Sequence, residues 1–164
     1  MNVASIRPLV KTDWNSVSKI YAQGIATGIA TFETEVPDWE TWNNKYIESC
    51  RIVAVTGNKV IGFGVISLVS PRQVYKGVAE VTVYVDNNYK GQRIGETLLR
   101  TLIEQSVAEG FWTLQAAIFS ENVASIELHK KCGFRVVGIR EKIGRLHGKW
   151  YDNHFLERRS KKID

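Results

Sequence analysis

A short basic loop between a predicted strand and a predicted helix carries the clearest chemical signal in this sequence. Residues 79–85 read A-E-V-T-V-Y-V, where valines alternate with other residues at the period of a strand. Residues 90–95 then read K-G-Q-R-I-G, and apolar residues follow at helical spacing from Ile94 to Val107. The first amides of a helix lack intrahelical partners, and the helix dipole favours negative charge beside them. This unit therefore predicts a site for a phosphate or pyrophosphate.

The loop does not match the two most familiar phosphate-binding motifs. The chain contains no G-x-x-x-x-G-K-[ST], so an NTP-binding P-loop is not expected, and no G-x-G-x-x-G dinucleotide fingerprint. A basic loop at a helix start is often only a solvated turn. Its meaning depends on the rest of the chain.

Asn122, Ser125 and His129 form a second polar constellation. Their spacing puts all three on one face of a short predicted helix, beside an apolar stripe that includes Cys132. A polar helix face is usually solvated, so these three residues alone do not predict a binding site; the rest of the sequence must support one.

The elements that would position these residues follow from periodicity, caps and turns. They are a strand at 6–10, a helix capped at 12 or 13 and running to 26, and a helix capped at 38 and running to 49. Then come strands at 51–56, 60–69 and 79–85, the helix after the basic loop, a strand at 111–119 and a helix at 122–132. Strands at 135–143 and 150–157 complete the chain. The order β-α-α-β-β-β-α-β-α-β-β predicts a mixed α/β fold built on one twisted sheet flanked by helices.

Length and composition narrow the class of protein. At 164 residues the chain is expected to be a single domain spanning 1–164, with ordinary apolar (44%) and charged (24%) fractions. No apolar run is long enough to span a bilayer, so no membrane association is expected. The net charge of +5 is spread along the chain apart from the basic tail at 158–162, and no aromatic-basic stacking motif favours nucleic acid.

The cysteines and histidines suggest neither a disulfide scaffold nor a metal site. Cys50 and Cys132 are widely separated thiols, which suit a reducing compartment. The N-terminal residues lack a basic segment followed by an apolar one, so no secretory signal is expected, and we predict a cytoplasmic protein. The three histidines show no metal-binding spacing, so no metal is expected.

Two segments and the order of elements together resemble the GCN5-related N-acetyltransferases (GNAT superfamily). Lys90-x-x-Arg93-x-Gly95 resembles the R/Q-x-x-G-x-G/A loop with which that family binds the pyrophosphate of acetyl-CoA. Residues 120–134, S-E-N-V-A-S-I-E-L-H-K-K-C-G-F, resemble the family's N-x-x-A/S-x-x-L-Y/H-x-x-x-G-F segment, which closes the other side of the coenzyme cleft. The resemblance implies the GNAT fold, acetyl-CoA as co-substrate and N-acetyltransferase activity.

Four further segments resemble the phosphinothricin N-acetyltransferases and their relatives. They are T-F-E-T-E at 31–35, A-E-V-T-V-Y-V at 79–85, the pair Leu128-His129, and H-G-K-W-Y-D at 147–152. Those enzymes acetylate the amino group of phosphinothricin, methionine sulfoximine or related amino acids. The resemblance extends from Ile6 to Arg159 and implies a small amino-acid-like substrate, direct attack of its amine on acetyl-CoA, and a homodimer.

The resemblance also assigns roles to individual residues. Glu80 corresponds to a general-base glutamate, and His129 stands where most of the superfamily has a tyrosine, as a candidate acid/base or orienting residue. The residues expected to bind the coenzyme are Val83, Tyr84, Val85, Lys90, Gly91, Gln92, Arg93, Ile94, Gly95, Glu96, Asn122 and Ser125. Phe32, Arg72 and Tyr75 are expected to bind the substrate.

This chain departs from the family pattern at two positions. Arg93 replaces a glycine of the loop, where a side chain fits easily if the residue is already helical. Ser70 stands where the phosphinothricin enzymes carry a basic residue, which weakens the case for a substrate with a second acidic group.

Two other kinds of function remain open at this point. The amine acceptor is alternatively a protein N-terminus, a lysine, a polyamine or an aminoglycoside. The chain is alternatively an acyl-CoA-binding sensor without catalysis, although Glu80 and His129 favour an enzyme. A nucleic-acid-binding domain would rest on net charge alone.

Overall fold

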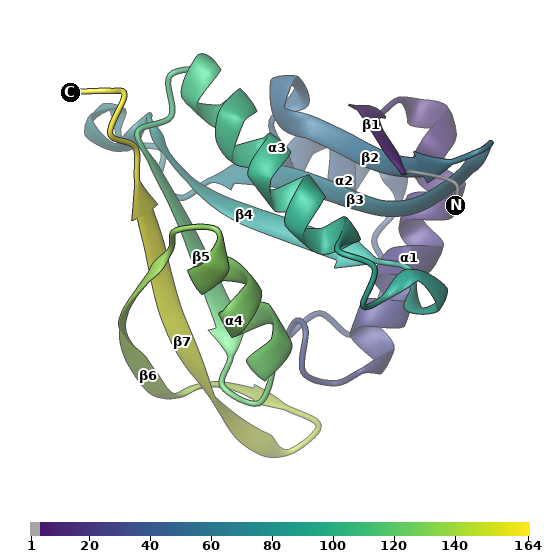
Figure 1. Cartoon of the computed structure of the whole chain (residues 1–164). Helices are drawn as coiled ribbons and strands as arrows, with labels where there is room; N and C mark the ends of the chain where they lie inside the picture. The colour runs from purple at the N-terminus through teal and green to yellow at the C-terminus, as the bar shows by residue number, and fades with distance from the viewer. Residues whose placement is uncertain (1–3) are drawn as a thin grey trace.

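Seven strands join in one open sheet in the computed structural model, which describes residues 4–164 (Figure 1). The strands are β1 (Ser5–Pro8), β2 (Arg51–Thr56), β3 (Lys59–Leu68), β4 (Val78–Val85), β5 (Thr113–Phe119), β6 (Arg135–Leu146) and β7 (Lys149–Arg159). The α-helices are α1 (Trp14–Ala26), α2 (Trp39–Lys45), α3 (Ile94–Ala108) and α4 (Val123–Lys131). This sequence of elements confirms the predicted order and the mixed α/β class.

The sheet has the spatial order β1-β2-β3-β4-β5-β7-β6, so the last strand of the chain lies between two earlier ones. Neighbouring strands are antiparallel except β4 and β5, which are parallel. The parallel pairing joins only Val78–Glu80 of β4 to Thr113–Gln115 of β5. Beyond Glu80 the two strands diverge and leave a gap in the middle of the sheet.

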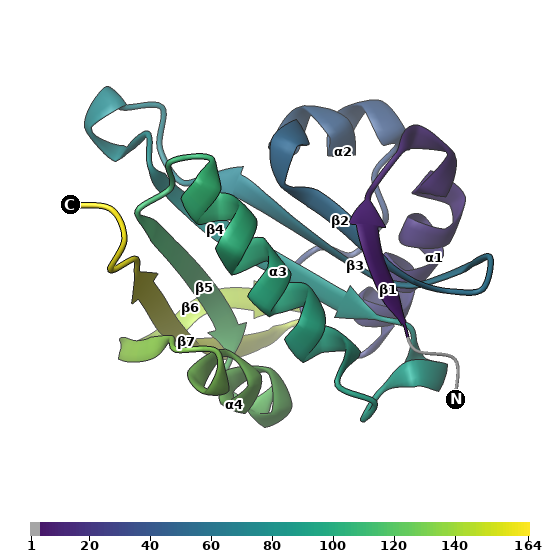
Figure 2. The same ribbon diagram turned by 45° about the horizontal axis from the view of Figure 1, so that its top comes forward.

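The helices cover the two faces of the sheet unequally. Figures 1 and 2 show α3 and α4 in front of the sheet, with α1 and α2 behind it. Each face has its own apolar cluster: α3 packs with Val81 of β4 on one, and α1 packs with Phe63 of β3 on the other. Because side chains of a strand alternate between faces, Glu80, Thr82 and Tyr84 belong to the α1 and α2 side.

Local sequence explains most of the element boundaries. Asp38 caps α2, its side chain accepting a hydrogen bond from the backbone N–H of Thr41 at 2.8 Å. Gly133, at a φ of 91°, ends α4, and the N–H of Phe134 reaches back to the carbonyl of His129 at 3.0 Å. Asp13 occupies the N-cap position of α1, but its side chain makes no capping hydrogen bond to the helix. Its carboxylate forms a salt bridge with Arg7 at 2.8 Å instead.

Several predicted boundaries were wrong, most clearly those of the second helix and the final hairpin. The second helix ends at Lys45 rather than near residue 49, because Tyr46 takes an extended conformation and buries its ring against Trp42. The final hairpin is longer than predicted, with β6 reaching Leu146 and β7 running from Lys149 to Arg159. A bulge or irregularity between Arg140 and Gly144 interrupts the register, so residue alternation does not continue through that stretch.

Candidate active site

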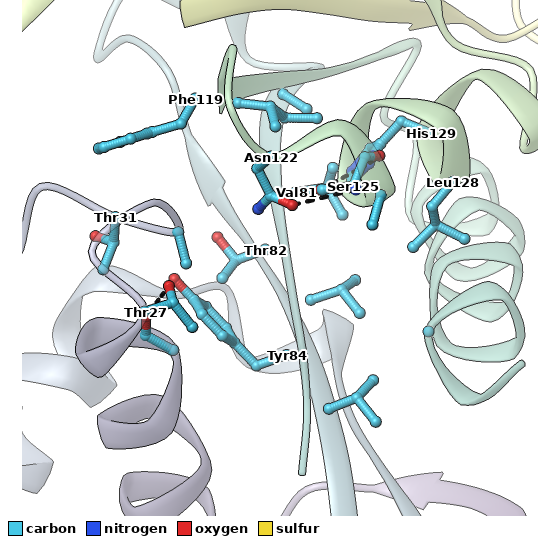
Figure 3. Close-up of a pocket in the computed structure, with 18 of the residues that line it drawn as sticks. Thr27, Thr31, Val81, Thr82, Tyr84, Phe119, Asn122, Ser125, Leu128 and His129 are labelled. Atoms are coloured by element: carbon cyan, nitrogen blue, oxygen red, sulfur yellow. Dashed lines mark hydrogen bonds between the residues drawn. The ribbon is translucent and has the colours of Figure 1, made fainter. Parts of the chain in front are cut away.

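A cleft of about 810 Å³ passes through the sheet where β4 and β5 diverge. Its walls include residues 81–85 of β4 and 116–119 of β5, the basic loop, one side of α4, and the segment that follows α1. Figure 3 shows its two sides. Thr82 and Tyr84 lie toward Thr27 and Thr31, whereas Asn122, Ser125 and His129 come from the opposite side. The cleft is therefore open to groups on both faces of the sheet.

The register of β4 determines which backbone groups point into the cleft. The carbonyl of Val78 accepts a hydrogen bond from Val69 on the β3 side, whereas the carbonyl of Gly77 accepts from Thr113 on the β5 side. Backbone groups of successive residues in a strand point to opposite edges. Val81, Val83 and Val85 thus direct N–H and C=O groups toward β5, where the strand has diverged.

The basic loop forms a cradle of free amides. Gly91 and Arg93 both have positive φ, 77° and 63°, and α3 starts at Ile94. Within residues 4–164, no backbone or side-chain acceptor binds the N–H groups from Gly91 to Glu96. Left-handed residues next to a helix start gather consecutive N–H groups into a concavity that suits anions. Arg93 is therefore the left-handed residue before α3 and is not part of the helix. A residue with a side chain would fit more easily at this position if it were helical.

Glu96 organises the charges behind this cradle. It is only 7% exposed, and Lys131, Arg100 and Arg93 approach its carboxylate at 2.7, 3.0 and 3.2 Å. Hydrogen bonds from Lys131 and Arg93 lower the pKa of Glu96 to about 2. The carboxylate is ionised near neutral pH and holds three cations at this end of the cleft.

A second glycine of the loop allows close packing of α3 and α4. A Cβ on Gly95 would lie 3.3 Å from Cδ2 of Leu128 and 3.6 Å from Cγ2 of Val85. A larger side chain would push α4 away from the end of β4. The loop motif thus sets the width of the cleft as well as its charge.

His129 is buried and holds its proton on the nitrogen that faces its own helix. Nδ1 lies 2.7 Å from the carbonyl oxygen of Ser125, which can only accept, so Nδ1 carries the proton and Nε2 is an acceptor. Burial lowers the pKa of His129, and Phe134 packs edge-on against its ring at 5.1 Å. His129 is thus a neutral acceptor near pH 7, which argues against the predicted alternative that it acts as an acid.

Glu80 lies on the other side of the cleft, at the last paired position before the strands diverge. Its carboxylate accepts a hydrogen bond of 3.4 Å from Gln115, its partner across the parallel ladder. Tyr46 lines the same part of the cleft, and burial raises the pKa of its hydroxyl to about 12. Glu80 and His129 therefore face the opening from opposite faces of the sheet.

Aromatic rings close the α1 and α2 side of the cleft. Phe32 contacts Phe119 with ring centroids 4.4 Å apart, and Tyr151 lies 5.0 Å from Phe119. Gly144 of β6 lies against the Phe32 ring so closely that a Cβ there would be 2.4 Å from Cζ. The final hairpin thus supports the wall to which Phe32 belongs.

Most of the predicted site residues line this one cleft. Those lining it are Phe32, Glu80, Val83, Tyr84, Val85, Lys90, Gly91, Arg93, Ile94, Gly95, Glu96, Asn122, Ser125 and His129. Gln92 does not line it, and neither do Arg72 and Tyr75. Those two residues lie in the segment between β3 and β4, are exposed, and pack on each other with the guanidinium 5.4 Å from the ring centroid.

Sequence reasoning missed several polar residues of the cleft. They are Thr27, Thr31, Glu33, Lys45, Tyr46, Thr82 and Asn153. The sequence contained a weak indication for Asn153, because a polar residue at an inward-facing position of a strand is unusual. Lys45 had none, because a lysine in the last turn of a helix is ordinary.

The described residues offer little support for other kinds of site. Within 4–164, no three or more His, Cys, Asp and Glu side chains are grouped so that they could hold a metal ion. Over the same range, no helix combines the length and the apolar character needed to cross a bilayer. Burial raises the pKa of both thiols, Cys50 to about 11, so neither is a ready nucleophile.

Comparison with known proteins agrees with this geometry. Residues 15–134 match the model of the acetyltransferase (GNAT) family. The L-methionine sulfoximine/L-methionine sulfone acetyltransferase of Pseudomonas aeruginosa is 28% identical, over 94% of this chain and 93% of its own length.

Two solved structures extend the comparison. A phosphinothricin acetyltransferase from Sinorhizobium meliloti in complex with AcCoA has a TM-score of 0.87 and 29% identity, covering 99% of this chain and 91% of that one. A ribosomal-protein-alanine N-acetyltransferase from Brucella melitensis has a TM-score of 0.88 and 28% identity, covering 95% and 99%. This chain belongs to the GNAT acetyltransferase family and is an acetyl-CoA-dependent N-acetyltransferase.

Proposed function

We propose that this chain transfers the acetyl group of acetyl-CoA, by direct attack, to the primary amine of a free amino acid or close analogue. Compounds of the phosphinothricin, methionine sulfoximine and methionine sulfone type are the first candidates. One observation carries the proposal: the cleft joins an amide cradle on one face of the sheet to an aromatic pocket with a carboxylate on the other. Two substrates that enter from opposite faces meet where β4 and β5 diverge.

The coenzyme occupies the α3 and α4 side in this proposal. Amides from Gly91 to Glu96 bind the pyrophosphate, and Lys90 and Arg93 add positive charge. The pantetheine arm pairs with the unpaired backbone groups of β4 at Val83 and Val85. Asn122 and Ser125 border it from α4, where the carbonyl oxygen of the Asn122 side chain already caps the helix by accepting from Ser125.

The acetyl transfer needs a base, an oxyanion donor and a path for the thiolate. Glu80, directly or through a water molecule, takes the proton of the substrate ammonium. The N–H of Val83, directed into the gap, donates to the oxyanion that forms as the amine attacks the thioester carbonyl. The C–S bond then breaks, and CoA leaves as a thiolate that takes up a proton from solvent through a water molecule held by Nε2 of His129. Holding both substrates in line supplies much of the remaining acceleration.

The substrate lies on the α1 and α2 side, against Phe32. Arg72 and Tyr75 were predicted to hold its acidic groups, but both lie outside the cleft of a single chain. The cations that line the cleft are Lys45, Lys90, Arg93 and Lys131, and the last three belong to the cradle end. We therefore assign the substrate carboxylate to Lys45.

A homodimer and a cytoplasmic location complete the proposal. The edge strand β6 exposes four large apolar side chains, Val136, Val137, Ile139 and Ile143, which supports association with a second copy. A strictly monomeric mass at assay concentration, with full activity, would refute the dimer. Two buried free thiols support a reducing compartment.

A coenzyme-release assay over a panel of amines tests the proposal. We expect turnover with free amino acids and their analogues, and slower turnover when the carboxylate is blocked. The panel includes a peptide beginning with alanine, because one structural neighbour is named for that acceptor. If acetyl-CoA raises the melting temperature but no amine is acetylated, the chain is a sensor and the proposal fails.

A further inference from the structure

The side-chain oxygen of Asn153 is an unused hydrogen-bond acceptor in the wall of the cleft. Asn153 is 7% exposed, and its Oδ1 is buried with no hydrogen-bond partner among residues 4–164. It lies on β7 and lines the cleft. A buried polar atom without a partner costs stability, so an acceptor left free beside a binding cleft points to a partner that the ligand provides.

In the part of the chain that the structure describes, three other buried side-chain atoms also lack partners, but none of them lies in this cleft. They are Nε of Arg51, Oε1 of Gln105 and Nε of Arg158. Arg51 already donates to Asn43 and to the carbonyl of Tyr46 through its other nitrogens. Asn153 thus combines an unused acceptor with a place in the wall of the cleft.

The sheet register locates Asn153 at the far end of the substrate pocket. Asn153 pairs with Phe119 across β5, so both side chains belong to one face, the face of the Phe32 and Tyr151 rings. Gln115, the partner of Glu80, precedes Phe119 by four residues, or about 13 Å of strand. A ligand whose amine lies at Glu80 can therefore extend along β5 toward Asn153.

We infer that Asn153 is a specificity-determining residue that selects substrates whose side chain ends in an N–H donor. This inference rests on the proposed function. A sulfoximine carries an N–H on sulfur and can donate to Oδ1. The corresponding sulfone has two acceptor oxygens and nearly the same shape, and a phosphinate presents anionic oxygens. Both would leave Oδ1 unpaired or facing another acceptor, so the preferred order is sulfoximine, then sulfone, then phosphinothricin.

The experiment compares methionine sulfoximine with methionine sulfone, which differ in the group that Oδ1 would meet. We measure kcat/KM for both with the full-length protein, and their affinities for its complex with CoA. The wild type is expected to prefer the sulfoximine by about tenfold, the effect of leaving one buried acceptor unpaired. Asn153→Val should abolish the preference, and Asn153→Thr, nearly the same shape with a hydroxyl, should retain part of it. Both suit a strand. Asn88→Leu, at an exposed residue outside the cleft, should leave the ratio unchanged.

The outcomes separate this inference from the proposed function. Equal use of the two compounds by the wild type, or a preference that survives in Asn153→Val, overturns the role of Asn153 while amino-acid acetylation stands. If no amino acid is acetylated but the CoA complex still binds the sulfoximine more tightly in an Asn153-dependent way, the proposed function fails and this inference holds. Binding of neither compound overturns this inference, and the amine panel then decides the proposed function.

Discussion

The α3 and α4 side of the cleft comes from one stretch of chain, whereas the α1 and α2 side is assembled from distant segments. Residues 90–131 supply the cradle, the glycine that sets helix packing, and the face of α4. The opposite wall combines the segment after α1, the end of α2, and the final hairpin. The α3 and α4 side binds a phosphate ligand through residues that are close together in the sequence. The α1 and α2 side differs wherever one of its scattered residues differs, so substrate choice can change without altering the coenzyme site.

Glu80→Gln should show the largest effect, because it removes the proposed base from the substrate side alone. We expect kcat to fall about 10²–10⁴-fold near neutral pH, with little change in coenzyme affinity. Higher pH supplies more free amine, so the defect should shrink on the alkaline side. Steady-state kinetics against pH, with calorimetric titration of acetyl-CoA, measure both. A parallel loss of coenzyme affinity would mean that the two sides are not independent.

His129→Phe should have the next largest effect, with kcat lowered about 10²-fold, the lower limit for a residue that assists proton transfer. Burial lowers the pKa of His129 below its ordinary value of 6.5, so an acid limb due to this residue lies below pH 6.5 and disappears in the variant. Between the lowered pKa and 6.5, His129 is protonated in the unfolded chain but not in the folded one. The free energy of unfolding therefore decreases as the pH is lowered through that window. Melting curves should show a smaller acid loss for His129→Phe. An acid limb that persists in the variant belongs to another group.

Lys45→Met and Arg72→Met form a matched pair that tests where the substrate carboxylate lies. We expect Lys45→Met to raise KM for amino acids about fivefold, the upper range for an exposed ion pair, and to spare coenzyme binding. Arg72→Met, outside the cleft, should change KM little. The reverse result would restore the role predicted for Arg72 from the sequence and place it in the pocket of a neighbouring subunit.

Arg93→Gly should have the smallest effect, because two consequences oppose each other. Glycine relieves the left-handed strain at a φ of 63°. The change also removes a cation from the cleft and from Glu96. We expect coenzyme affinity to fall about threefold at low salt and less at high salt. Tighter binding by the glycine variant at every salt concentration would show that the arginine obstructs the cradle.

The same contrast decides how much of the molecule the sequence could reveal. The order of elements followed from periodicity and caps, since each depends on neighbours along the chain. The cradle and the polar face of α4 also lie within short segments, and both were found. Lys45 and Asn153 were missed because each is one polar residue in an unremarkable position, and only the sheet brings them to the cleft. Arg72 was assigned through the family resemblance, without the fold to say where its loop points.

Details that depend on tertiary packing were equally hidden. The early end of α2 reflects the burial of Tyr46 in the α1 cluster. Arg93 adopts a left-handed conformation that arginine itself does not favour, so its residue type did not indicate it. The tautomer of His129 depends on the 2.7 Å contact between its Nδ1 and the carbonyl oxygen of Ser125.

The position of β7 also governs how the chain is completed during synthesis. β6 pairs only with β7 within residues 4–164, and β7 fills the space between β6 and β5. A nascent chain that has emerged as far as residue 146 already contains every residue of the cradle, but its β6 has no strand to join, and the core beneath α3 lacks Leu156. Since translation proceeds from the N-terminus, β7 is the last of the seven strands to be made. A ribosome that stalls before β7 would leave a chain with the cradle residues present, an incomplete core, and two open strand edges exposed to aggregation.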